Sequence, residues 1–295
     1  MVVLTYCIAM RLNAGLVFLS DSRTNAGVDQ IGTFRKMSMF ENPGDRMMVL
    51  MSAGNLSISQ SIRQMVAEYL SPDGTSIWTA SSMAEAAQIV GECIRNVHKR
   101  DAESLEKFGI DFNVSLIFGG QIRGERCRLL QMYSAGNFIE SHDENPYFQI
   151  GESKYGKPIV DRVISPVTPL DEAAKCALIS MDSTLRSNIS VGFPLDLLVY
   201  GTDSLSIGRF VTIDEKNQYF QMIRSTWGQQ LKSVFESIPD PAWNAAPEAT
   251  SNVLSTSGHL NHPVRISPPS SVTRIETRTP QRQTLAQDDD HKRQH

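Results

Sequence analysis

The fold is first indicated by the segment Thr5-Tyr-Cys-Ile-Ala-Met-Arg-Leu-Asn-Ala-Gly-Leu-Val-Phe-Leu-Ser-Asp21. Two short apolar runs, over 5–10 and 16–21, are rich in β-forming residues, and a polar turn over 11–14 separates them. The segment therefore predicts a β-hairpin at the start of the chain.

Strands and helices follow in alternating blocks. A buried strand is expected at 47–52, and it leads through Ala53-Gly54-Asn55 into a helix over 56–70. Ser82 and Glu85 form a capping box that predicts the start of a second helix. The remaining strands are expected at 112–118, 128–133, 147–150, 195–200 and 208–213, with a turn at 119–120 and helices at 158–164 and 171–188.

This order of strands, two helices, strands, two helices and strands is typical of a layered α+β domain. The count fits a four-layer αββα sandwich, in which helices cover the outer faces of two sheets. We expect this domain to span 5–238.

The composition excludes several classes of protein. The chain has 295 residues and a net charge of −4, so it has no basic excess for binding nucleic acid. No apolar run approaches the ~20 residues that a membrane helix needs, and the first residues do not resemble a secretory signal. Four cysteines lie singly along the chain, as in reduced cytosolic proteins. The sequence predicts a cytoplasmic protein without metal or cofactor.

The composition changes near residue 239. From there to residue 295 the chain is rich in Pro, Ser, Thr, Asn, Gln and Arg, with Trp243 as its one aromatic residue apart from histidine. Such a segment buries too little apolar surface to offset the entropy lost on ordering. We expect 239–295 to be a disordered polar tail.

Three residues near the start could supply nucleophilic chemistry. If Thr5 were the first residue, its own α-amine, with a pKa of about 7.7–8.0, could take the proton of its hydroxyl. A lysine such as Lys36 would lower that pKa, and Asp21 would hold the lysine in place. The backbone N–H of Gly54 could stabilise the oxyanion. A purely structural interpretation is also open, with Thr5 starting a strand, Asp21 in a turn, Lys36 at the surface and Gly54 in a strand-to-helix turn.

Two other motifs suggest different chemistry. Gly151-Glu-Ser-Lys-Tyr-Gly-Lys-Pro158 is nearly a P-loop, but Pro158 replaces the Ser or Thr that would bind Mg²⁺. Proline in the first turn of a helix is the structural alternative. His142 lies in an acidic stretch that could bind a metal, although loop polarity explains this stretch as well.

Several motifs, in this order, resemble proteasome β-subunits. They are Thr5-Tyr-Cys-Ile-Ala-Met10, Leu19-Ser-Asp21-Ser-Arg23, Lys36, Ser52-Ala-Gly54, Leu116-Ile-Phe-Gly-Gly120, Ile150-Gly-Glu-Ser153 and Arg186-Ser-Asn-Ile-Ser-Val-Gly192. Thr24-Asn-Ala-Gly-Val-Asp29 is most similar to the bacterial branch called Anbu, the ancestral β-subunit. The resemblance covers roughly residues 5–236.

This resemblance implies the αββα fold of N-terminal nucleophile hydrolases and a threonine endopeptidase. Thr5 would be the nucleophile, Asp21 and Lys36 its activators, Gly54 the oxyanion donor, and Ser190 part of the hydrogen-bond set near the amine. In two places the sequence departs from the family pattern: Ser187 stands where the family usually has an aspartate, and Glu152 or Ser153 where it has a serine.

The substrate would be a peptide or unfolded protein, and the chain would self-associate into a ring or a helical homo-oligomer. Two alternatives remain: a catalytically silent ring or scaffold subunit, or an N-terminal nucleophile amidase acting on a small amide or modified peptide. Either catalytic interpretation requires a free Thr5. Residues 1–4 would then be a propeptide, or translation would begin at position 4.

Overall fold

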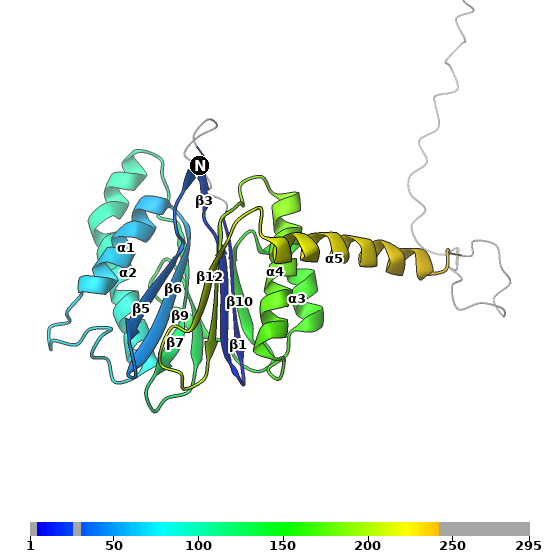
Figure 1. The fold of residues 1–295 in the computed structure, drawn as a ribbon. Coiled ribbons are helices and arrows are strands. Elements are labelled where there is room, and N and C mark those ends of the chain that lie inside the picture. Colours follow the sequence, from blue (N-terminus) through cyan, green and yellow to red (C-terminus); the bar gives the residue numbers. More distant parts are fainter. Residues whose placement is uncertain (1–4, 26–30, 242–295) are drawn as a thin grey trace, which may run out of the picture. The chain divides into compact units, whose positions relative to one another are not determined.

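Two antiparallel sheets pack face to face in the computed structural model (Figure 1), which describes residues 5–25 and 31–241. Helices α1 (Leu56–Glu68) and α2 (Met83–Lys107) cover the outer face of one sheet, and α3 (Lys157–Val163) and α4 (Leu170–Ser187) cover that of the other. The predicted αββα sandwich is therefore confirmed.

The first sheet has the strand order β10-β1-β2-β11-β12. Its strands are β1 (Tyr6–Leu12), β2 (Gly15–Asp21), β10 (Tyr147–Gly151), β11 (Leu195–Gly201) and β12 (Arg209–Ile213). β1 and β2 pair antiparallel from Cys7–Ser20 to Leu12–Gly15, which confirms the predicted hairpin. The turn is shorter than predicted because the strand pairing continues through Arg11 and Leu12.

The second sheet has the strand order β5-β6-β7-β8-β9. Its strands are β5 (Met37–Asn42), β6 (Arg46–Gly54), β7 (Val114–Ile122), β8 (Arg128–Met132) and β9 (Phe138–Glu140), and β3 (Arg23–Asn25) pairs with β4 (Ile31–Thr33) as a separate ribbon. The sequence did not indicate β3, β4, β5 or β9. β5 has no strict two-residue alternation of buried positions, and the other three have only three residues each.

The predicted turn at Gly119-Gly120 is wrong, because both glycines lie inside β7. A Cβ on Gly120 would lie 2.1 Å from the carbonyl oxygen of Met47 on β6, so the close approach of these strands requires glycine. The chain turns instead at 123–125, before β8.

Ser82 caps α2 as predicted, since its side chain accepts a hydrogen bond from the Glu85 amide at 3.1 Å. The Glu85 carboxylate does not complete the reciprocal bond to Ser82. It accepts hydrogen bonds from the amide and hydroxyl of Ser81 instead.

Three apolar layers hold the sandwich together. The middle layer, between the sheets, contains fully buried residues such as Phe18, Met47 and Leu198. The other two lie under α1 and α2, and under α3 and α4. The packing of these layers fixes the strand registers, because a slip by one residue would exchange side chains of the middle layer with those of an outer layer.

Helix α5 (Gln218–Ser237) was not predicted, and only its first turns are packed. Phe220 and Ile223 are buried against the layer under α4. Further along, Leu231, Val234 and Phe235 occupy one helical stripe and are 50%, 57% and 77% exposed. We call these three residues the α5 stripe.

Residues 1–4 and most of the expected tail, from residue 242 onward, lie outside the described residues. No helix in the described ranges has both the length and the apolar character needed to cross a membrane.

Candidate active site

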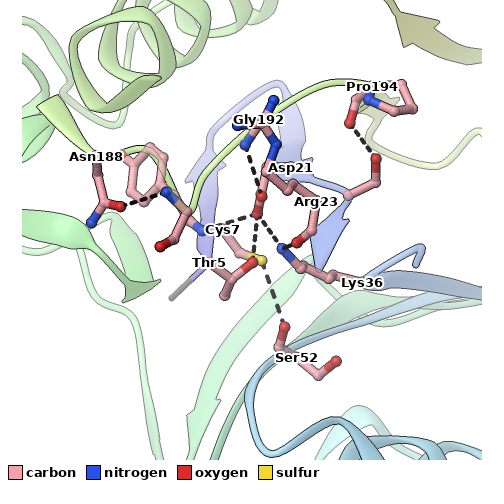
Figure 2. Close-up of polar contacts among 12 residues, drawn as sticks. Thr5, Cys7, Asp21, Arg23, Lys36, Ser52, Asn188, Gly192 and Pro194 are labelled. Carbon is pink, nitrogen blue, oxygen red and sulfur yellow. Dashed lines mark hydrogen bonds and ion pairs between the residues drawn. The ribbon is translucent and has the colours of Figure 1, made fainter. Parts of the chain in front are cut away.

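The carboxylate of Asp21 is the centre of a buried polar cluster at the end of β2 (Figure 2). Its Oδ1 atom accepts hydrogen bonds from Thr5 Oγ1 at 2.5 Å, Lys36 Nζ at 2.7 Å and the Tyr6 amide at 3.0 Å. Its Oδ2 atom accepts one from the Gly192 amide at 3.2 Å. Asp21 thus joins the threonine and the lysine that the sequence singled out.

The hairpin explains why Thr5 and Asp21 meet. Thr5 directly precedes β1 and Asp21 ends β2. Antiparallel pairing therefore places both residues at the same end of the β1–β2 hairpin. On its other side, Asp21 pairs with Leu195 of β11. Neighbouring strands on both sides therefore fix the position of the carboxylate.

Lys36 reaches the cluster from the start of the second sheet. Its side chain is 6% exposed, and its ammonium also donates to the carbonyl oxygen of Arg23 at 2.6 Å. Burying an ion pair costs free energy of desolvation, which is recovered only with well-formed hydrogen bonds. The short contacts to Asp21 and Arg23 meet that requirement and hold the positive charge beside Thr5.

Gly54 shares a cavity of about 20 Å³ with Thr5 and Lys36. It ends β6, and the Asn55 side chain caps α1 by accepting from the Ser57 amide. The cavity has room for about one water molecule. Four sequence-selected residues, Thr5, Asp21, Lys36 and Gly54, therefore come together at one place.

The other candidate residues from the sequence are less directly connected to Thr5. The Ser190 amide donates to the Asn188 side chain at 2.9 Å, but the Ser190 hydroxyl makes no hydrogen bond within the described part of the chain. Ser187 is the exposed last residue of α4, and Ser153 begins the short 3₁₀ helix η1 (Ser153–Tyr155). Neither of these two contacts Thr5 by a hydrogen bond among the described residues.

Glu152 is attached to Thr5 through the backbone. Its amide donates to the carbonyl oxygen of Thr5 at 2.7 Å. Its carboxylate is 11% exposed, and Oε2 lies 3.4 Å from the ammonium of Lys154 without hydrogen-bond geometry. Of the secondary candidates, Glu152 is the one with a direct contact to Thr5.

Sequence reasoning assigned no role to Arg23, Gly192 or Cys7. Arg23 and Gly192 contribute backbone atoms, and the identity of a side chain does not indicate such a role. The Cys7 thiol faces the Ser52 carbonyl at 3.8 Å (Figure 2). Burial, and secondarily the charge of Asp21, raise the pKa of the Cys7 thiol far above its usual value, so Cys7 is uncharged beside Thr5.

The P-loop-like segment and His142 both make ordinary structural contacts. The Lys157 ammonium binds the Tyr147 hydroxyl at 2.6 Å and the Asp161 carboxylate at 2.9 Å, while Pro158 lies in the first turn of α3. His142 forms an isolated β-bridge with Asn145. Within residues 5–25 and 31–241, no group of three or more His, Cys, Asp or Glu residues is placed to hold a metal ion.

Comparison with solved structures found close relatives. The chain is 54% identical to "Anbu (ancestral beta-subunit) from Yersinia bercovieri", with a TM-score of 0.76 over 81% of this chain and 100% of that one. It is 47% identical to the Pseudomonas aeruginosa protein in "Helical Assembly of the Anbu Complex", with a TM-score of 0.77 over 81% of this chain and 98% of that one.

An Anbu (Gly-1) mutant from Hyphomicrobium sp. strain MC1 is 46% identical, with a TM-score of 0.76 over 81% of this chain and 100% of that one. No protein-family model and no curated protein matched the chain.

Proposed function

Because this chain belongs to the Anbu (ancestral β-subunit) family of proteasome-like proteins, we propose that it is a threonine-type N-terminal nucleophile hydrolase that cleaves peptide bonds. One observation carries the proposal: Thr5 Oγ1 and Lys36 Nζ both bind the same buried oxygen of Asp21. A scaffold subunit would not need this arrangement, because the burial of an ion pair alone gives little or no net stability.

The first step requires a free α-amine on Thr5. The neutral amine removes the hydroxyl proton, and Oγ1 attacks the carbonyl carbon of the substrate. The Lys36 ammonium lowers the amine pKa and keeps a fraction of the amine neutral near pH 7. Asp21 orients both the Thr5 hydroxyl and the lysine.

The attack produces a tetrahedral oxyanion, for which the Gly54 amide supplies a donor at the edge of the cavity. Collapse of this intermediate breaks the C–N bond, and the α-ammonium gives its proton to the leaving amine. The ester on Thr5 is then hydrolysed by water, which the same amine deprotonates. The proton returns to the Thr5 oxygen, so the cycle is balanced.

Glu152 is the better candidate for holding the α-ammonium in place of the family's aspartate. It is bound to the Thr5 carbonyl through its amide, and it carries a nearly buried carboxylate. Ser187 is exposed, and Ser190 stays a proposed member of the hydrogen-bond set near the amine.

Self-association is part of the proposal. The Pseudomonas aeruginosa relative forms a helical assembly of the Anbu complex. In this chain the α5 stripe leaves three large apolar side chains exposed on one helical face, and such a face favours burial against another copy. We propose a homo-oligomer in the cytoplasm that encloses the Thr5 sites.

A variant pair tests the catalytic proposal. Peptide hydrolysis is measured with the oligomer of the wild type, Thr5→Ala and Thr5→Ser. Thr5→Ala lacks the nucleophile and should lose at least about a thousandfold in kcat/KM, while Thr5→Ser keeps a hydroxyl and should keep measurable activity. Equal activity of Thr5→Ala and the wild type would exclude Thr5 as the nucleophile. A wild type that assembles but hydrolyses no peptide would support the scaffold alternative.

A further inference from the structure

A second pocket lies beside the loop that joins α4 to β11. It has a volume of about 530 Å³, and its lining includes Arg23, Arg186, Gly192, Phe193, Glu215 and Arg224. Three arginines line this one hollow, and their summed positive charge attracts an anion unless acidic side chains compensate it.

Two of these arginines share one buried carboxylate. Asp182 of α4 binds Arg186 Nε at 3.1 Å and Arg224 Nε at 2.7 Å, and its side chain is 2% exposed. The Arg224 guanidinium also lies over the ring of Phe193, 6.0 Å from its centroid. These contacts hold the two guanidinium groups in fixed positions while other N–H groups stay available.

The third arginine has no acidic partner among the described residues. Arg23 donates to the carbonyl oxygen of Ile189 at 2.9 Å. Its guanidinium lies against Gly192, where an added Cβ would come within 2.1 Å of Nε, so glycine leaves room for the guanidinium at this position. Counting Asp182 and Glu215 as negative, the pocket keeps an excess of one positive charge.

We propose that this pocket is a binding site for a small anionic molecule that carries a phosphate or carboxylate group. Guanidinium groups bind both groups through paired N–H donors. The volume is within the usual range for small-molecule sites, and Phe193 supplies an apolar wall for the rest of the ligand.

The pocket is connected to the Asp21 cluster by two backbone contacts. The carbonyl of Arg23 accepts from Lys36 Nζ at 2.6 Å, and the amide of Gly192 donates to Asp21 Oδ2 at 3.2 Å. An anion that moves Arg23 or Gly192 therefore changes the surroundings of Lys36 and Asp21. The site is a regulatory one that acts on the residues beside Thr5, and by linkage a ligand on Thr5 changes its anion affinity equally.

Isothermal titration calorimetry with pyrophosphate and with citrate, at low salt, tests the site without any turnover. The full-length wild type should bind at least one probe, and which probe binds distinguishes a phosphate ligand from a carboxylate ligand. Arg23→Gln and Arg186→Gln should each weaken binding about tenfold, the loss expected for a charge-assisted contact. Arg209→Gln removes an arginine that pairs with exposed Asp171 outside the pocket, so it should bind as the wild type does.

The proposal is overturned if the wild type binds neither probe, or if Arg209→Gln weakens binding as much as the two pocket variants. Arg186 is largely exposed, so Arg186→Gln keeps the test valid if Arg23→Gln does not fold.

Hydrogen exchange of the Gly192 amide tests the connection to Asp21. Slower exchange with the bound probe is expected, and an unchanged rate would contradict the regulatory role. A failure of peptide hydrolysis would leave all these results unaffected.

Discussion

The Thr5 hydroxyl and the Asp21 carboxylate are joined by a buried hydrogen bond of 2.5 Å, although the two residues are 16 positions apart in the sequence. The β1–β2 hairpin creates this contact, and Lys36 completes it from the other sheet. The same carboxylate therefore connects the hydroxyl that would attack with the charge that would adjust the amine.

Replacing Lys36 by methionine should affect both stability and activity. The variant leaves Asp21 charged and buried without its ion-pair partner, which should lower the free energy of unfolding by about 3–5 kcal/mol. The α-amine should also stay protonated to a higher pH, so hydrolysis at pH 7 should fall. Denaturant unfolding and peptide hydrolysis measure the two effects.

Lys107→Met is the matched control, because the Lys107 side chain at the end of α2 is 69% exposed and its partner Glu103 is exposed as well. It should change the free energy of unfolding by less than about 1 kcal/mol. If Lys36→Met were as stable and active as Lys107→Met, the role given to Lys36 would be wrong.

Glu152→Gln should move the pH dependence of hydrolysis. In the proposed mechanism the carboxylate would stabilise the protonated amine and so raise its pKa, while the neutral amine would be the active form. Removing the negative charge should shift the acidic limb of the kcat/KM profile about one unit to lower pH. Ser187→Ala should leave the limb in place, and the opposite pattern would assign the role to Ser187.

The α5 stripe should hold copies of the chain together. Phe235→Glu places a charge among exposed apolar side chains and should shift the particle toward smaller species in light scattering. Gln229→Glu adds the same charge on the polar face of α5 and should leave the particle size unchanged. Smaller particles with Gln229→Glu, or a wild type that is monomeric at micromolar concentration, would contradict the proposed assembly.

The four cysteines should be unreactive in the folded protein. All are buried, and burial raises the pKa of Cys176 to about 11 and that of Cys93 to about 12. The thiolate is the reactive form, so Ellman's reagent at pH 8 should detect almost no thiol until the chain is unfolded. Rapid reaction of Cys7 in the native particle would show that the Asp21 cluster is open to solvent.

The raised pKa values of the cysteine thiols also predict how the free energy of unfolding changes with pH. Above about pH 9, unfolded chains lose thiol protons that folded chains keep, so the free energy of unfolding should fall as the pH rises through 9–11. Below pH 8 these thiols should contribute no pH dependence.

Strands and helices with a local pattern of residue types could be predicted from the sequence. Contacts with backbone atoms from distant parts of the chain could not. The hairpin, the buried strand β6 and the capped helix α2 have local signals in residue type and spacing. Gly119 and Gly120 suggested a turn because glycine is also the usual turn residue. Both glycines instead leave room for neighbouring strands. Met47 on β6 closely approaches Gly120, and Leu129 on β8 lies against Gly119, so the requirement for glycine depends on tertiary packing.

The same limit applies to the site. Thr5, Asp21 and Lys36 were found because their side chains have recognisable chemistry. The backbone donors and acceptors of Gly192 and Arg23 have no such signal. Helix α5 was missed although its apolar residues recur at helical spacing, as at Leu231, Val234 and Phe235, so this element could have been predicted from the sequence.

The central claim is that the Thr5 nitrogen is a free α-amine in the mature protein. An intact-mass measurement with N-terminal fragmentation tests this claim most directly. The sample is the assembled particle made from its native gene. We expect a mature chain that begins at Thr5 with an unmodified amine, whether a propeptide is cleaved or translation begins at position 4. A particle in which Leu4 is still joined to Thr5 would have no basic nitrogen at this position, and would contradict catalysis by Thr5.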